Sequence, residues 1–272
     1  MKQLSPALRC ITAPNPGVMT GDGTNTYIVG SEKVAVVDPG PAIPEHIDAI
    51  LDAVGDRIDW IIVTHTHSDH SPAAALLAEK TGAPCLGMLS QESRFQDSSF
   101  KLDQLLEHNR LIQSDEFSLR TIYTPGHVDN HFCFLLEDDG ILLAGDHLMN
   151  GRTVVIIPPQ GDMHAYIQSL KQLLEYDIKA IAPGHGELIN NPQEVIEWTV
   201  AHRLAREAKV VSKLQQLKSA TVSELVVRVY DDVDKSLHRV AEASLLAHLL
   251  KLEKERVVAS HMAVDSSVWR IV

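Results

Sequence analysis

Short apolar segments alternate with segments of helical spacing along the first part of the chain. Two of the apolar segments, 33–38 and 60–64, are rich in β-branched residues, which is typical of buried strands. Helices are predicted at 44–54 and 72–81, and Asp138-Asp139-Gly140 predicts a hairpin turn between two further strands. Since some strands alternate with helices and others pair as hairpins, we predict sheets with helices on their outer faces.

The pattern changes near residue 197, where segments of helical spacing follow one another without strands between them. We predict three helices and then two strands, at 198–218, 222–230, 237–254, 257–260 and 268–272. Helices followed by a strand, a turn and a second strand are typical of a winged-helix-like module. The sequence therefore predicts an α/β domain over 1–196 and a small winged-helix-like domain over 197–272.

The charge of the 272-residue chain is unevenly distributed, with a net value of -12. Residues 197–272 hold 12 basic and 10 acidic side chains, which leaves 12 and 26 for residues 1–196. Bound divalent cations would offset part of this acidic excess, and a large basic groove for a nucleic acid is not visible in these totals. No apolar run approaches the ~20 residues that cross a bilayer, and the first residues lack a secretory signal, so we expect a cytoplasmic protein.

Side chains that ligate metals follow four predicted strands directly, in loops that a rigid strand positions. They are, in chain order, His65, His67, Asp69, His70, His127, Asp146 and His185. His65 and His67 lie two apart in an extended segment, so both imidazoles point to the same side and can share one metal ion. Asp69 and His70 come after the chain begins to turn and can reach a second ion. Imidazole nitrogen together with carboxylate oxygen suits zinc, with iron or manganese as alternatives.

Five short motifs resemble those of the metallo-β-lactamase superfamily. They are VDPG at 37–40, HTHSDH at 65–70, TPGH at 124–127, GD at 145–146 and PGHG at 183–186, in the order of that family. The resemblance implies an αββα sandwich with the site at one edge. It also implies two ligand groups with Asp146 as a bridge between them: His65, His67 and His127 for one ion, and Asp69, His70 and His185 for the other.

A closer resemblance is to the β-lactamase-like protein two group and its bacterial relatives. It rests on GTNTY at 23–27, TPGHVDNH at 124–131 and LLKLEKERVV at 249–258, the last within the predicted winged-helix-like domain. This likeness implies a phosphodiesterase that acts on single-stranded RNA. Zinc β-lactamases resemble the chain at HxHxD but do not use a bridging aspartate like Asp146. The site pattern therefore resembles the thioesterase and phosphodiesterase branches of the superfamily rather than the antibiotic-cleaving one.

The chemistry that this resemblance implies is hydrolysis by a hydroxide shared between two zinc ions, since each cation lowers the pKa of a bound water. Asp69 is the candidate proton acceptor, with a role as a ligand alone as the alternative. We expect Asp38 either to accept the second N–H of a metal-ligating histidine or to shape the turn where it stands. His131, and Asn150 in the loop 147–161, are candidates for contacts with the ligands or with substrate.

Three functions stay open at this point. The first is cleavage of phosphodiesters such as single-stranded RNA, and the second is a thioesterase of the hydroxyacylglutathione hydrolase type, whose ligand set is the same. The third is a DNA-binding winged helix with the sandwich as a metal-site sensor. Expected partners are therefore single-stranded RNA or a small-molecule ester or thioester, and no membrane. The C-terminal domain is expected to pack against the rest of the chain or to form a homodimer.

Overall fold

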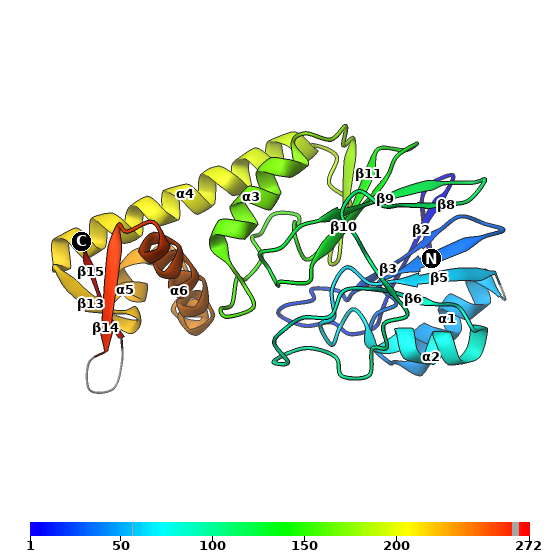
Figure 1. Cartoon of the computed structure of the whole chain (residues 1–272), viewed down its shortest axis with the longest axis horizontal. Coiled ribbons are helices and arrows are strands. Elements are labelled where there is room, and N and C mark those ends of the chain that lie inside the picture. The colour runs from blue at the N-terminus through cyan, green and yellow to red at the C-terminus, as the bar shows by residue number, and fades with distance from the viewer. Residues whose placement is uncertain (56, 263–266) are drawn as a thin grey trace.

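The computed structural model, which describes residues 1–55, 57–262 and 267–272, contains two facing β-sheets with helices outside them (Figure 1). In each sheet the neighbouring strands are consecutive in the chain. The seven strands of the first sheet are β1 (Lys2–Ser5), β2 (Leu8–Thr12), β3 (Asn25–Val29), β4 (Val34–Val37), β5 (Ile58–Ile62), β6 (Cys85–Gly87) and β7 (Gln104–Leu105). The five strands of the second are β8 (Leu111–Gln113), β9 (Ser118–Tyr123), β10 (Phe132–Leu136), β11 (Ile141–Gly145) and β12 (Ala180–Pro183).

Alternate side chains of the central strands divide between two apolar layers, as the two-residue period of a strand requires. In β4, Ala35 and Val37 join the layer between the sheets, whereas Val34 and Val36 pack with the outer helices. Those outer helices are α1 (Pro44–Val54) and α2 (Pro72–Thr81) on the first sheet and α3 (Met163–Leu173) on the second. The order helix, sheet, sheet, helix confirms the αββα sandwich that the resemblance implied.

The helices of the first part lie where the sequence predicts them, because their ends carry local signals. Pro44 and Pro72 stand in the first turn of α1 and α2, where a missing backbone N–H costs nothing. Gly55 and Gly82, at positive φ, end the same two helices. The side chain of Asp162 accepts hydrogen bonds from two backbone N–H groups at the start of α3, which makes it the N-cap of this helix.

One strand of the site ends earlier than its apolar pattern indicates. The predicted strand 60–64 is observed as β5, which begins and ends two residues earlier. The backbone N–H of Thr64 donates to Asp38 Oδ1 at 2.7 Å, so it leaves the sheet ladder at this point. The chain therefore turns out of the sheet just before His65.

The C-terminal part begins on a helix that belongs to both parts of the chain. The predicted helix 198–218 is observed as α4 (Pro192–Leu217), whose first residues pack on the sandwich through Ile196. The boundary between residues 196 and 197 therefore lies inside a continuous helix. The remaining elements are β13 (Ser219–Thr221), α5 (Val222–Val229), the short helix η1 (Lys235–Leu237), α6 (His238–Lys254), β14 (Val258–Met262) and β15 (Ser267–Ile271). The three strands form one small antiparallel sheet, which gives the winged-helix arrangement predicted for this part.

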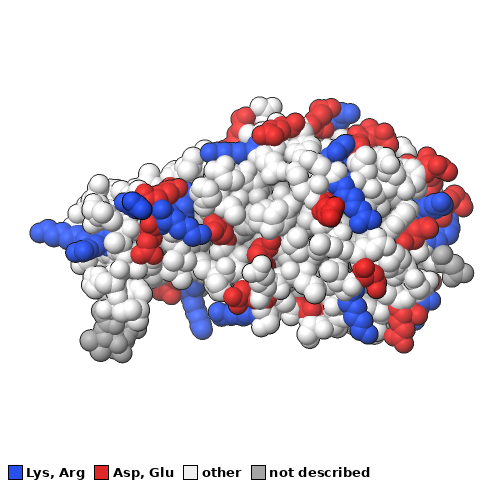
Figure 2. All heavy atoms as spheres, viewed as in Figure 1, with Lys and Arg blue, Asp and Glu red and all other residues white. Residues whose placement is uncertain are grey.

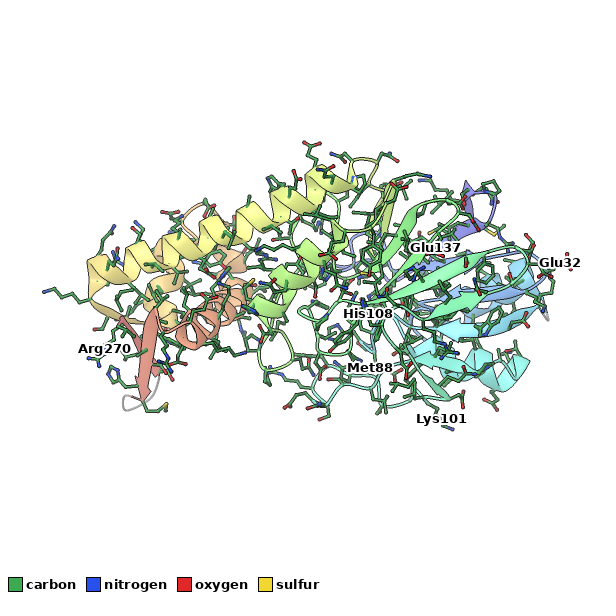
Figure 3. The ribbon with its side chains drawn as sticks, turned by 45° about the horizontal axis from the view of Figure 1, so that its top comes forward. Glu32, Met88, Lys101, His108, Glu137 and Arg270 are labelled. Atoms are coloured by element: carbon green, nitrogen blue, oxygen red, sulfur yellow. The ribbon has the colours of Figure 1, made fainter. Side chains whose placement is uncertain are left out.

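Acidic and basic side chains are mixed over the face of the molecule shown in Figure 2. Glu32, beside the first sheet, and Arg270, on β15, lie at opposite ends of the elongated molecule (Figure 3). None of the helices in the described ranges combines the length and apolar character that crossing a membrane requires.

Candidate metal centre

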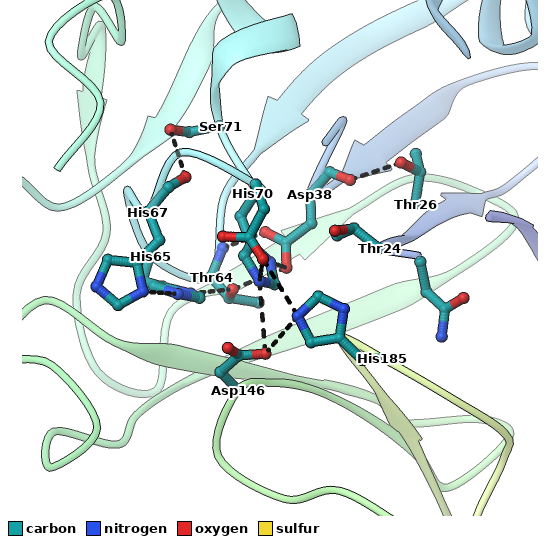
Figure 4. A network of polar contacts seen from close by, with 12 residues as sticks. Thr24, Thr26, Asp38, Thr64, His65, His67, His70, Ser71, Asp146 and His185 are labelled. Carbon is teal, nitrogen blue, oxygen red and sulfur yellow. Dashed lines mark hydrogen bonds and ion pairs between the residues drawn. The ribbon is translucent and has the colours of Figure 1, made fainter. Parts of the chain in front are cut away.

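Seven side chains from four loops meet at one edge of the sandwich, between the two sheets. Figure 4 shows His65, His67, His70, Asp146 and His185 among them. Four of them follow β5, and one each follows β9, β11 and β12; in chain order they are His65, His67, Asp69, His70, His127, Asp146 and His185. All seven residues predicted as ligands are therefore brought together. Gly184 allows this close approach, because a Cβ atom at this position would lie 2.8 Å from Asp146 Oδ1.

The first ligand group consists of three histidines and one carboxylate oxygen of Asp146, Oδ2. His67 Nδ1 lies 3.0 Å from His65 Nε2 and 3.3 Å from His127 Nε2. His127 Nε2 lies 3.7 Å from Asp146 Oδ2. Zinc–nitrogen bonds of about 2.0–2.1 Å in a tetrahedral site place neighbouring ligand atoms about 3.3 Å apart, so this spacing fits a metal ion at the centre of the group.

The second ligand group consists of Asp69, His70 and His185, which face the other oxygen of Asp146. His185 Nε2 lies 3.3 Å from Asp69 Oδ2 and 3.3 Å from Asp146 Oδ1. His70 Nε2 lies 3.6 Å and 3.4 Å from the same two oxygens. Among the described residues, His70 Nε2 and Asp146 Oδ1 are buried without any hydrogen-bond partner. Such orphaned atoms are costly unless a ligand satisfies them, and a cation fits this donor set.

The electrostatics of the two groups differ. Burial lowers the pKa of His65 and His127, and it lowers that of His67 to about 3. These rings are therefore neutral and offer lone pairs to a metal. Burial also acts on His185, but the neighbouring carboxylates outweigh it and raise the pKa of this ring to about 9. The second group thus attracts positive charge strongly, which a bound cation can supply in place of protons.

Four of the five histidines are oriented by a hydrogen bond from the ring nitrogen that faces away from the centre. His70 Nδ1 donates to Asp38 Oδ2 at 2.9 Å, and that oxygen also accepts from Thr64 Oγ1 at 2.8 Å. Three further rings donate in the same way: His65 Nδ1 to Thr64 Oγ1, His127 Nδ1 to the carbonyl oxygen of Val155, and His185 Nδ1 to the carbonyl oxygen of Gly23. Asp38 thus contacts a ligand histidine, which is the first of the two roles that the sequence left open for it. Thr64 and the two backbone carbonyls were missed, because nothing in their residue type marks such a role.

His131 and Asn150 differ in burial and in contacts. His131 is fully buried; its Nε2 accepts the backbone N–H of Asp146 at 3.2 Å, while its Nδ1 lies 2.9 Å from Thr124 Oγ1. It therefore supports the loop that carries Asp146. Asn150 is exposed, and it lines a cavity of about 290 Å³ that has His185 in its wall. This cavity reaches the centre at His185.

Comparison with known protein families assigns both parts of the chain. Residues 19–185 match the metallo-β-lactamase superfamily, and residues 221–269 match the β-lactamase-associated winged helix domain. A β-lactamase-like protein 2 homolog from Drosophila melanogaster is 30% identical over 94% of this chain and 90% of its own. A protein from Aspergillus chevalieri named atrochrysone carboxyl ACP thioesterase is 31% identical over 100% of this chain and 89% of its own.

Solved structures share the whole architecture, including the C-terminal domain. A metallo-β-lactamase family protein from Thermus thermophilus superposes with a TM-score of 0.80 at 22% identity, covering 98% of this chain and 100% of its own. A β-lactamase domain protein from Burkholderia ambifaria gives a TM-score of 0.83 at 18% identity, covering 99% and 93%. At these identities the likeness supports the fold alone.

Proposed function

We propose that this chain, which belongs to the metallo-β-lactamase superfamily and is a hydrolase of that superfamily, holds two zinc ions and cleaves thioester bonds. The observation that carries the proposal is the position of Asp146, whose two oxygens face the two ligand groups at 3.3–3.7 Å. A carboxylate between two such groups would help to hold a cation in each of them. When bound, the ions lower the pKa of a water between them and take up the charge that develops on the substrate oxygen. Iron or manganese suits the same donors.

The residues of the chain have distinct tasks in this reaction. Asp146, held through its backbone by His131, is fixed between the groups and is only 10% exposed. The Asp69 side chain is 28% exposed, so it alone of these two carboxylates has one side open to the solvent. Asp69 therefore orients the attacking water and accepts its proton, which then passes to the sulfur of the leaving thiol.

The charge around the cavity beside His185 favours a thioester over a nucleic acid. The cavity beside His185 is lined by two carboxylates, those of Asp22 and Glu187, and by one guanidinium, that of Arg152. An RNA strand carries one negative charge per nucleotide and needs basic side chains along its path. A thioester is uncharged at the reacting carbonyl. The likeness to a protein named as a thioesterase, at 31% identity, supports the same substrate class.

Cleavage of phosphodiesters such as single-stranded RNA is the second candidate. It is supported by the motifs shared with the β-lactamase-like protein two group and by the 30% identity to its Drosophila homolog. The exposed Arg152 beside His185 offers one contact to a phosphate.

The position of the C-terminal domain disfavours binding of its third helix in a DNA groove. Helix α6, the long third helix of the domain, packs on the sandwich through Ala247. Lys254, at its end, pairs with Asp162 of the sandwich at 2.7 Å. A helix held in this way is not free to enter a groove, so we favour a packing role for this domain over the DNA-binding alternative.

The Asp146→Asn variant tests the centre, with Asp52→Asn on the exposed side of α1 as the matched control. Metal content by elemental analysis should be about two equivalents for wild type and control and lower for Asp146→Asn. The rate should fall at least about a hundredfold with it, because an amide bridges two cations poorly. Full retention of metal and rate in Asp146→Asn would contradict the bridging role.

A substrate panel tests the reaction. It comprises the acetyl thioester of N-acetylcysteamine, S-lactoylglutathione, a single-stranded RNA oligonucleotide and bis(p-nitrophenyl) phosphate. We expect metal-dependent release of thiol from the first substrate, lost in His67→Ala. Cleavage of RNA without cleavage of either thioester would overturn the thioesterase proposal in favour of the second candidate.

A further inference from the structure

A second cavity lies between the sandwich and the C-terminal domain. Its volume is about 470 Å³, within the range of about 300–1,000 Å³ that is usual for ligand pockets. Both parts of the chain form its mainly apolar wall: Met149, Val154 and Val155 come from the sandwich, and Leu237, Val240 and Ala241 come from the C-terminal domain. Val18 and Met19 also line it, and both are exposed, so apolar side chains extend to its opening.

This cavity adjoins the metal centre. Met149 and Arg152 line both it and the smaller cavity that has His185 in its wall. Val155, a wall residue of the larger cavity, accepts a hydrogen bond from His127 Nδ1 at 2.8 Å through its carbonyl oxygen. A molecule with its reacting carbonyl beside His185 can therefore extend past Met149 into the larger cavity.

Some side chains that line the same cavity carry polar atoms without hydrogen-bond partners. Arg203 and Tyr230 are 4% and 7% exposed, and among the described residues Arg203 Nε and Tyr230 Oη have no hydrogen-bond partner. His202 Nδ1, in the same wall, is also buried without a partner. Arg206 differs, because it is held by Asp232 at 2.6 Å and 2.9 Å. These donors are covered by neighbouring atoms in this structure, so an oxygen atom of a bound molecule reaches them only where side chains of the wall move.

We propose that this cavity, named here the interdomain pocket, binds the acyl part of the substrate, and that the acyl group is large, apolar and oxygenated at its far end. This inference rests on the proposed thioesterase function, since it places the reacting carbonyl at the metal centre. The C-terminal domain is then a substrate-binding element: its Leu237 and Val240 cover the acyl group and Tyr230 donates to the distal oxygen. Acyl groups that do not reach the pocket gain none of this binding.

The test compares acyl groups on one leaving group. N-acetylcysteamine thioesters of acetate, 2-naphthoate and 6-hydroxy-2-naphthoate differ in apolar area and in the distal oxygen. We expect KM to be about tenfold lower or more for the naphthoyl thioesters than for the acetyl thioester, because the ring leaves water in the pocket. Equal KM values for acetyl and naphthoyl thioesters would overturn the proposal.

Val240→Asp tests the apolar wall, and Leu204→Asp is the matched control. Both side chains are 41% exposed, so neither substitution buries a charge deep in the protein, and only Val240 lines the pocket. Val240→Asp should raise KM for the naphthoyl thioesters about tenfold and leave that for the acetyl thioester unchanged. Leu204→Asp should change neither value. An equal effect of the two variants would contradict the pocket.

Tyr230→Phe tests the distal oxygen. The hydroxyl has no partner within the described residues, so its removal should leave the thermal midpoint unchanged. We expect KM to rise about two- to tenfold for the 6-hydroxy-2-naphthoyl thioester only, since one hydrogen bond is lost. Unchanged KM for that substrate would show that Tyr230 makes no hydrogen bond to the acyl group and would overturn this part of the proposal.

Direct binding separates failure of the pocket from failure of the proposed function. Titration calorimetry with 6-hydroxy-2-naphthoate needs no turnover. Binding that Val240→Asp weakens and Leu204→Asp does not supports the pocket even where no thioester is cleaved, and the thioesterase function then fails alone. Cleavage of all three thioesters without binding of this acid and without an effect of Val240→Asp overturns the pocket and leaves the function standing.

Discussion

Asp38 shows how much of the metal centre depends on residues that do not face it. Its carboxylate accepts from His70 Nδ1 and from both the backbone and the hydroxyl of Thr64. The seven inward-facing residues were predictable, because histidine and aspartate directly after apolar strands form an unusual pattern. Thr64 and the carbonyls of Gly23 and Val155 were not, because a backbone carbonyl has no sequence signature and its direction is set only by the fold.

Asp38→Asn should weaken zinc binding about 10- to 100-fold, as is typical when the partner of a ligand histidine is changed. The amide oxygen can still accept the Thr64 N–H, but the amide nitrogen cannot accept from His70. Asparagine also tolerates the positive φ of 49° at this position. Competition with a chelating dye measures the affinity, and Asp52→Asn again serves as control. Wild-type affinity in Asp38→Asn would show that His70 needs no such partner.

Among the elements, those with local end signals were predictable and those defined by tertiary contacts were not. The helices α1 and α2 match their predicted bounds, because proline begins and glycine ends each of them. The start of α4 is an exception: Pro192 stands in its first turn, yet the predicted start lies six residues later, and the first residues of the helix pack on the sandwich through Ile196. Strands β1, β2, β3, β6, β7, β8 and β13 were not predicted; of these, β6, β7, β8 and β13 have only two or three residues, which show no period.

Helices α4 and α6 are joined by a buried ionic group, and Glu207→Gln tests how much this group contributes to the free energy of unfolding. Lys251 Nζ lies 2.7 Å from Glu207 Oε1, and His248 Nδ1 lies 3.5 Å from Oε2. Burial raises the pKa of Glu207, but the interactions with His248 and Lys251 outweigh it and lower this pKa below its ordinary value of 4.5. A lowered folded-state pKa contributes stability that is present above 4.5 and is lost as the pH falls through the folded value.

Glu207→Gln should therefore reduce the free energy of unfolding by about 1–3 kcal/mol at pH 7. The difference from wild type should begin to shrink as the pH falls below 4.5, where Glu207 of the unfolded chain takes up its proton, and should be smallest below the folded-state pKa, where the folded carboxylate is protonated as well. Urea denaturation at pH 7 and at pH 4 measures both values. Glu242→Gln, in the second turn of α6, is the control, because Glu242 makes no ion pair with any described residue. A difference that grows toward low pH would refute this account.

At the scale of the whole molecule, the two parts share one helix and one pocket rather than meeting at a linker. Helix α4 runs through both, and Ala247 of α6 belongs to the apolar cluster of the second sheet. The backbone N–H of Ile156 also donates to Ser244 Oγ across the junction. Because these contacts couple the parts, we expect them to unfold together, and a bound metal to stabilise both.

Two tryptophans report on this coupling separately: Trp60 lies in β5 and Trp269 in β15. With Trp198 and one of the two replaced by phenylalanine, the remaining fluorescence follows either the sandwich or the C-terminal domain. In each variant, we expect the midpoint of the fluorescence transition to coincide with the midpoint measured by calorimetry. Chelation by EDTA should lower the fluorescence midpoints of both variants by the same amount. The shift at Trp269 is the decisive part, because no predicted ligand lies in that domain and only coupling through α4 and the interdomain contacts can transmit it. A transition at Trp269 that chelation leaves unmoved would mean that the domains unfold independently.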